Sequence, residues 1–138
     1  MIATPFLTRP ATLLGVLLLP AVALADVMDW KKLDDDPAGF IGKPIEVLGY
    51  CAQGGVNGDA DGYQCSTEGN LYISTPAIKP ASARKKIEEN CGGLDVVERS
   101  DFCRAKISFT PQSVSTSTEL EPGKTITIIS TDIATVKF

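Results

Sequence analysis

The chain has 138 residues, of which 43% are hydrophobic, and its 17 Asp and Glu residues outnumber its 13 Lys and Arg residues. This hydrophobic content suits one folded domain with a core and excludes a disordered chain. The sequence contains no histidine, which excludes His-based catalytic triads and His-ligated zinc sites. The formal net charge of −4 disfavours nucleic acid as the partner, because proteins that bind its phosphates usually present a basic face.

Residues 1–25 have the pattern of a secretory signal peptide. An apolar run over residues 11–24 follows the positively charged Arg9 and ends in Ala23-Leu24-Ala25. Signal peptidase accepts small residues such as Ala23 and Ala25 at the first and third of these positions. The run is shorter than the roughly 20 apolar residues that a membrane-spanning helix needs. We therefore expect a mature domain of residues 26–138, periplasmic or secreted, with no stable membrane insertion.

Four cysteines lie in the expected mature domain, at Cys51, Cys65, Cys91 and Cys103. An even number of cysteines in an exported protein indicates disulfides, and four cysteines allow three connectivities. The spacing favours Cys51–Cys65 and Cys91–Cys103, because each pair brackets a turn-rich stretch and closes a loop of about 12–15 residues. The sequence contains no C-x-x-C pair, the spacing typical of redox-active cysteines and of four-thiolate zinc sites, so neither function is expected.

The mature domain is expected to begin with a short helical turn over residues 27–33, where apolar side chains recur at a spacing of three. Asp36-Pro37 should end this turn, because the residue before a proline is pushed out of the helical region. Residues 43–52 alternate apolar and polar side chains, which predicts a strand. Gly49 within this strand suggests a bulge or a sharp coil.

Further strands are predicted by alternating or β-branched sequence at residues 63–66, 70–75, 102–109 and 124–138. A bulge is expected in the last of these strands at Ile128-Ile129, where the apolar alternation breaks. Residues 80–90 have the pattern of a helix, with Pro80 in its first turn and Gly92-Gly93 after its end.

This order places a single helix between the third and fourth of five strands. It is the layout of the OB-fold, a five-stranded Greek-key β-barrel. The predicted fold class is therefore mostly β, an OB-fold-like barrel with one α-helix and disulfides, in a single domain of residues 26–138. Another small sandwich or half-barrel is the alternative.

The segment Asp36-Pro37-Ala38-Gly39-Phe40-Ile41-Gly42-Lys43-Pro44-Ile45-Glu46-Val47-Leu48-Gly49-Tyr50 resembles the first-strand entry of many bacterial OB-fold proteins. In those proteins a proline and an aromatic residue precede Ile-Gly-Lys, and alternating aliphatic residues then lead to a glycine. The chain is thus distantly similar to the bacterial OB-fold (BOF) family of periplasmic proteins. The resemblance covers the expected mature domain by layout and residues 36–50 by motif. It implies an OB-fold and a stress-related periplasmic role, and it assigns no functional residue.

One segment has the spacing of a metal-binding motif. Asn57-Gly58-Asp59-Ala60-Asp61-Gly62, followed after five residues by Glu68, fits the calcium-loop template. The side-chain oxygens of Asn57, Asp59, Asp61 and Glu68 are of the type that binds Ca²⁺. The flanking sequence lacks the amphipathic helices of an EF-hand, so the alternatives are a weak calcium site in a strand loop and a solvated turn. No other cofactor is expected.

The predicted function is that of a non-enzymatic binding or stress-related module of the cell envelope, because the sequence places no catalytic pair of carboxylates. OB-folds present an open barrel face to sugars, nucleotides or peptides, and Tyr50, Tyr63 and Tyr72 on the first three strands are candidate contact residues. The expected ligand is an envelope protein, a peptide or a glycan rather than nucleic acid. A calcium-binding protein that uses residues 57–68 is the alternative.

Three other side chains are given ordinary roles by the sequence. Trp30 is expected to cover the bottom of the barrel or to join the core. Arg104 and Lys106, on the outer face of a predicted strand, are interpreted as solubility residues.

Overall fold

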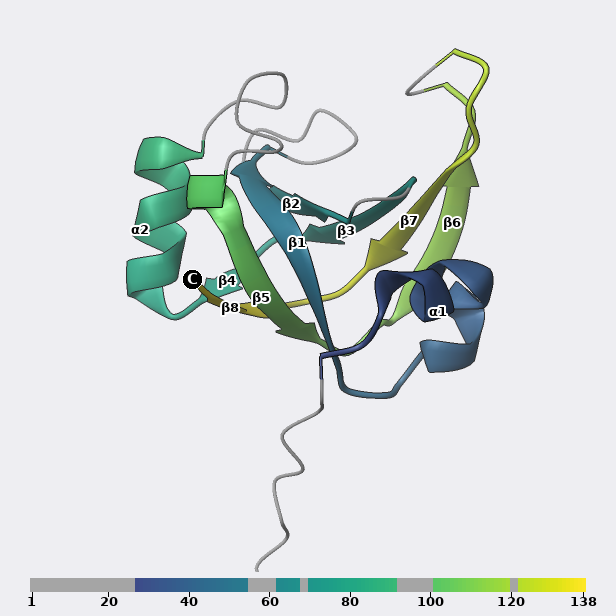
Figure 1. The fold of residues 1–138 in the computed structure, drawn as a ribbon, viewed down its shortest axis with the longest axis horizontal. Helices are drawn as coiled ribbons and strands as arrows, with labels where there is room; N and C mark the ends of the chain where they lie inside the picture. Colours follow the sequence, from purple (N-terminus) through teal and green to yellow (C-terminus); the bar gives the residue numbers. More distant parts are fainter. Residues whose placement is uncertain (1–26, 55–61, 68–69, 92–100, 120–121) are drawn as a thin grey trace, which may run out of the picture.

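The computed structural model describes residues 27–54, 62–67, 70–91, 101–119 and 122–138, and Figure 1 shows their arrangement. The fold is mostly β, with one eight-stranded sheet and one main helix. The predicted signal peptide, residues 1–25, lies outside the described residues. Within the described part of the chain, no helix has the length and apolar character needed to cross a membrane.

Two short helical segments precede the first strand. α1 (Trp30–Asp35) is capped by Asp29, whose carboxylate accepts a hydrogen bond from a first-turn backbone N–H group at 3.1 Å. The 3-10 helix η1 (Pro37–Phe40) starts at the proline that was expected to end the first helical turn. Leu33 anchors α1, because its side chain is fully buried in the main core.

The strands are β1 (Ile45–Gln53), β2 (Tyr63–Ser66), β3 (Leu71–Thr75), β4 (Ile78–Lys79), β5 (Arg104–Phe109), β6 (Ser113–Ser117), β7 (Ile126–Ser130) and β8 (Ala134–Lys137). The main helix α2 (Ala81–Asn90) lies between β4 and β5, and a 3-10 turn η2 (Asp101–Cys103) leads into β5. The predicted helix over residues 80–90 and the first four predicted strands are confirmed.

The strand order in the sheet is β4-β8-β5-β1-β2-β3-β7-β6. β1 pairs antiparallel with β2 on one side and with β5 on the other, while β3 and β7 are parallel. β7 and β8 are consecutive in the chain but lie far apart in this order, so the sheet is strongly curved, as Figure 1 shows. The sheet has eight strands, with β4 and β6 as its edges. The mostly β class with one main helix is therefore confirmed, but the sheet has more strands than the five expected and does not close into a barrel, so the OB-fold is not confirmed.

The predicted strand over residues 124–138 is divided into β7 and β8 by residues 131–133. At this break, the hydroxyl of Thr131 donates to the carbonyl of Thr110 at 2.9 Å, and its backbone N–H donates to the carbonyl of Ser74 at 3.0 Å. These bonds hold the chain at the break. Before it, β7 pairs with β3, and after it, β8 pairs with β5. This redirection, together with the short strand β4 and the polar strand β6, accounts for the extra strands.

The bulge predicted at Ile128-Ile129 is wrong. Both residues stay in register with Tyr72 and Ile73 of β3. The apolar alternation breaks for another reason: β7 is apolar on both faces. Ile129 belongs to the main core, while Ile128 packs with Ile126 and Tyr72 in a second, smaller cluster.

The main core lies between the inner face of the sheet and α2, and it includes the fully buried Ile73, Ile87 and Ile107. Both predicted disulfides are present within it. Cys51–Cys65 joins β1 to β2, and Cys91–Cys103 joins the end of α2 to η2. All four cysteines are buried. In the chain-entropy model, each bridge stabilises the fold by about 3 kcal/mol.

Gly49 lies at a close approach between strands, and of the two expected alternatives, a bulge or a sharp coil, the bulge is wrong. It pairs with Ala105 in an unbroken ladder between β1 and β5. A Cβ atom at this position would lie 2.6 Å from the backbone carbonyl oxygen of Ser66 on β2. The glycine therefore lets β2 pack tightly against β1.

Candidate functional site

The outer face of the sheet carries two neighbouring hollows along β1 and β5. The N-terminal hollow has a volume of about 300 Å³ and is lined by Val27, Met28, Asp29, Trp30, Leu48, Gly49, Tyr50 and Arg104. The cationic hollow has a volume of about 480 Å³ and is lined by Leu48, Asp101, Arg104, Ala105, Lys106, Lys137 and Phe138. Leu48 and Arg104 line both hollows, so the two form one continuous surface. We call this surface the outer groove.

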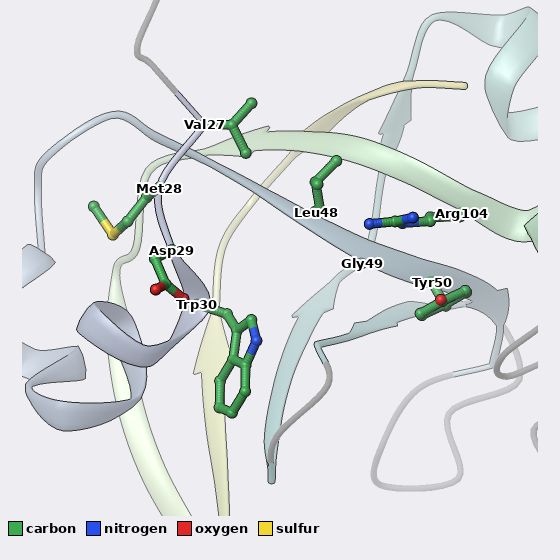
Figure 2. Close-up of a pocket in the computed structure, with 8 residues that line it drawn as sticks. All are labelled: Val27, Met28, Asp29, Trp30, Leu48, Gly49, Tyr50 and Arg104. Atoms are coloured by element: carbon green, nitrogen blue, oxygen red, sulfur yellow. The ribbon is translucent and has the colours of Figure 1, made fainter.

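Strand register places the central side chains of the outer groove. Tyr50 of β1 is paired with Arg104 of β5, and Leu48 is paired with Lys106. Lys106 is in turn paired with Lys137 of β8. Alternate residues of a strand point to the same face, so all five side chains emerge on the outer face. Figure 2 shows the guanidinium group of Arg104 lying over β1 beside Leu48.

The wall of the N-terminal hollow is built by the segment before α1. The backbone N–H of Met28 donates to the carbonyl of Glu46 at 2.7 Å, and Met28 forms an isolated parallel bridge with Val47. This pairing keeps residues 27–29 extended beside β1, so the predicted helical turn begins only at Trp30. Trp30 is half-buried and lies at the edge of the hollow (Figure 2).

Positive charge gathers in the cationic hollow. Its lining contains three cationic side chains, Arg104, Lys106 and Lys137, against one acidic side chain, Asp101. Among the described residues, an ion pair is seen between Lys85 and Glu89 on α2, with its nitrogen and oxygen 3.8 Å apart, and it lies outside this hollow. The cationic hollow is therefore locally positive in a protein whose net charge is −4.

Lys86 of α2 anchors the aromatic end of the cationic hollow. Its ammonium group lies 4.1 Å from the ring centre of Phe138 and 4.5 Å from that of Phe102. A cation within about 6 Å of an aromatic ring centre is attracted to its face. These contacts hold Phe138, which is 41% exposed, at the margin of the hollow.

The structure does not bring the three predicted tyrosines together on one surface. Tyr50 is half-buried and lines the N-terminal hollow. Ser66 of β2 is paired with Tyr50 on one side and with Tyr72 on the other, so Tyr72 lies on the same face as Tyr50. Tyr72, however, packs against the second apolar cluster. Tyr63 has the opposite parity and points inward, where it is 6% exposed. Sequence alternation within each strand was too local to relate the three strands to one another.

Tyr63 has a structural role beneath α2. Its hydroxyl donates a short hydrogen bond to the carboxylate of Glu88. Burial raises the pKa of Tyr63 above its ordinary value, and the hydrogen bond and negative charge of Glu88 raise it further, while the positive charge of Arg84 opposes the shift. Tyr63 therefore stays protonated and connects β2 to α2.

The four candidate calcium ligands, Asn57, Asp59, Asp61 and Glu68, lie outside the described residues. Within the part of the chain that the structure describes, no group of three or more acidic or cysteine side chains could hold a metal ion. Calcium binding by residues 57–68 stays a prediction from the sequence.

Sequence reasoning missed the role of Trp30, Leu48 and Arg104 in the outer groove, because each comes from a different element. The signal that could have revealed the site is the unexpected apolar Leu48 on the polar side of β1, together with alternating cations on β5. Apolar, aromatic and cationic side chains of this kind can bind an organic ligand that carries negative charge. Comparison with protein-family models, with curated proteins and with solved structures finds no match for this chain, so its function is inferred from this geometry.

Proposed function

We propose that this protein is a non-enzymatic binding module of the cell envelope that binds a peptide, protein or glycan in its outer groove. One observation carries the proposal: the two hollows join through Leu48 and Arg104 into a continuous surface with apolar, aromatic and cationic side chains. Ligand sites typically combine an apolar lining with a few polar groups that fix orientation.

Two features support the cell envelope as the location. Both disulfides are of the kind that persist in oxidising compartments outside the cytoplasm. Residues 1–25 also have the sequence pattern of a secretory signal peptide.

The strand pairings support an OB-like arrangement behind this surface. β1, β2, β3 and β5 correspond in chain order to the first four strands expected, and β7 with β8 takes the place of the fifth. The main helix α2 precedes β5, as the OB-fold layout requires. OB-folds commonly bind extended oligomers on an open face, and β1 contributes to both hollows here.

Trp30 provides a direct test, because it is the single tryptophan of the chain and lines the N-terminal hollow. Residues 26–138 with intact disulfides would be titrated with pools of peptides and of cell-wall glycan fragments while the emission of Trp30 is recorded. We expect a saturable change in emission with at least one pool.

Two variants would localise the binding. Leu48→Ala should weaken it, because Leu48 lines both hollows. Ile41→Ala is the matched control, since Ile41 is 45% exposed, similar to the 37% of Leu48, and does not line either hollow. The proposal fails if no pool gives a saturable change, or if Leu48→Ala and Ile41→Ala bind equally well.

A further inference from the structure

We infer that the ligand of the outer groove is an acidic polypeptide segment in an extended conformation, with an apolar side chain seated in the N-terminal hollow; this inference rests on the proposed function. The partner class follows from charge complementarity, from the spacing of the cations and from the chemistry of the walls.

Lys106 and Lys137 form the first part of the charge argument. They are direct partners in the antiparallel ladder between β5 and β8, which places their Cβ atoms roughly 4.5–5.5 Å apart. Like charges in directly opposite positions destabilise a sheet. A negatively charged ligand would remove this repulsion.

The acidic side chains near these cations form no direct ion pair with them in the described part of the chain. Glu46, on the same face of β1, accepts a hydrogen bond from the hydroxyl of Ser108 at 2.9 Å. Asp29 caps α1, and Asp101 is one carboxylate among three cations. Within the described residues, none of these carboxylates forms an ion pair with Arg104, Lys106 or Lys137. The cations therefore remain available to a ligand.

The spacing of the cations favours an extended polypeptide. Arg104 and Lys106 are two residues apart on β5, and same-face positions along a strand recur every 6.4–6.8 Å or so. Alternate side chains of an extended peptide have this same repeat, so two acidic residues of a ligand could meet both cations at once. The guanidinium group of Arg104 can also bind a carboxylate through two parallel hydrogen bonds.

The walls of the N-terminal hollow favour a peptide over a sugar. Val27, Met28 and Leu48 contribute aliphatic surface, which suits an apolar side chain. Sugar rings carry many hydroxyl groups that require polar partners. In the N-terminal hollow these three aliphatic side chains offer no hydrogen bond, and the carboxylate of Asp29 already accepts one from the first turn of α1.

The test compares three probes of known chemistry by fluorescence anisotropy and by the emission of Trp30. The first is a labelled peptide in which Glu alternates with Val, the second is the same peptide with Gln in place of every Glu, and the third is polygalacturonate, an acidic glycan. We expect the Glu peptide to bind at least about tenfold more tightly than the Gln peptide, as three exposed charge contacts together can supply. The preference should shrink as the ionic strength rises.

Charge-removing variants identify the contacts. Arg104→Gln, Lys106→Gln and Lys137→Gln should each weaken binding of the Glu peptide by about two- to fivefold, the range for exposed charge pairs. Lys85→Gln is the matched control, because Lys85 is an exposed cation on α2 that lines neither hollow. It should bind as the parent does. Circular dichroism of each variant verifies that the fold is retained.

The outcomes separate the inference from the proposed function. If the Gln peptide binds as tightly as the Glu peptide, or if the three variants bind as Lys85→Gln does, the inference is wrong while the binding function stands. If polygalacturonate binds more tightly than the Glu peptide and displaces it, the ligand is an acidic glycan and the inference is again wrong. If no probe and no pool changes the emission of Trp30, the proposed function itself fails.

Discussion

Lys106 of β5 and Lys137 of β8 lie directly opposite each other in an antiparallel ladder, on the surface that forms the cationic hollow. A cross-strand pair of opposite charge contributes roughly 0.2–1 kcal/mol, and a pair of like charge opposes folding. Both side chains are exposed, so solvent and salt weaken their repulsion. This pair therefore lowers the stability of the free protein, and an acidic ligand of the kind proposed above would offset that cost.

Lys137→Glu should therefore raise the free energy of unfolding by up to about 1 kcal/mol at low ionic strength, with a smaller gain at high salt. Urea unfolding at two salt concentrations measures the effect. In a Lys106→Gln background, the gain should largely disappear, because the opposing charge is gone. A gain that persists in that background would contradict the pairwise explanation. The same substitution should weaken binding of an acidic peptide.

The inner face of the sheet could be predicted from the sequence because burial imposes a period of two on each strand. Ile45, Val47 and Cys51 of β1 alternate as the core requires. β6 was missed because its side chains are mostly polar and its place in the sheet depends on backbone pairing with β7. The two-residue strand β4 is too short to have a period.

The outer groove could not be predicted because it is a product of register. Trp30, Leu48 and Arg104 look ordinary in their own segments, and the pairing of β1 with β5 and with the segment around Met28 brings them together. The same reason explains why the three candidate tyrosines do not share one face of the sheet. Parity within one strand says nothing about its offset from the next strand, and that offset turns Tyr63 inward.

The disulfide Cys91–Cys103 should matter for stability, because it joins the end of α2 to η2, directly before β5. Replacing both cysteines by alanine should lower the free energy of unfolding by about 2–5 kcal/mol, the usual cost in a small secreted domain. Chemical denaturation under non-reducing conditions measures this loss, and peptide mapping of the parent should recover both bridges. A loss well below 2 kcal/mol would contradict the predicted contribution of this bridge, and no loss would contradict a stabilising role.

The raised pKa of Tyr63 predicts that the stability of the fold decreases at alkaline pH. Burial and Glu88 raise the pKa of Tyr63 in the folded protein above its unfolded value of about 10. The folded state therefore holds the proton more tightly. The resulting stabilisation is fully present below the unfolded pKa and is lost as the pH rises through the folded pKa.

Tyr63→Phe should lose about 1 kcal/mol at neutral pH, the net value of one hydrogen bond, because the acceptor Glu88 is exposed and can bind water. The difference from the parent should narrow above pH ~10. Denaturation as a function of pH measures both effects, with Tyr50→Phe on the outer face as the control. A constant difference across the alkaline range would contradict the titration of Tyr63.

Gly49→Ala should destabilise the fold by about 1–3 kcal/mol, the range for overpacking, because the new Cβ atom would lie 2.6 Å from the carbonyl oxygen of Ser66 and 2.9 Å from a methyl group of Ile107. Gly123→Ala is an informative comparison. Its Cβ atom meets nothing within 4 Å, but its φ of +81° is unfavourable for alanine, at a cost of about 1–2 kcal/mol. Thermal unfolding measures the loss of stability in both variants: the loss in Gly123→Ala comes from the backbone alone, and the loss in Gly49→Ala comes from the steric contacts. Equal stability of the parent and Gly49→Ala would contradict the close approach.

Calcium tests the alternative function suggested by residues 57–68. The neutral first ligand Asn57 lowers the charge of the candidate site, and the sequence provides no EF-hand helices to organise it. We therefore expect a dissociation constant in the weak range of about 10⁻⁴–10⁻³ M. At a calcium concentration equal to that constant, the stabilisation is only about 0.4 kcal/mol, so removal of calcium by a chelator should lower the melting temperature slightly.

Isothermal titration calorimetry with Ca²⁺ measures this affinity directly. Asp59→Ala should abolish the heat of binding, because it removes one candidate carboxylate ligand, whereas Asp132→Ala removes an exposed carboxylate outside the loop and should have no effect. Micromolar affinity that depends on Asp59 would contradict the prediction of a weak site and would favour a calcium-binding function over the outer groove. A complete absence of heat would show that the residues between Asn57 and Glu68 do not form a calcium site, whatever their match to the loop template.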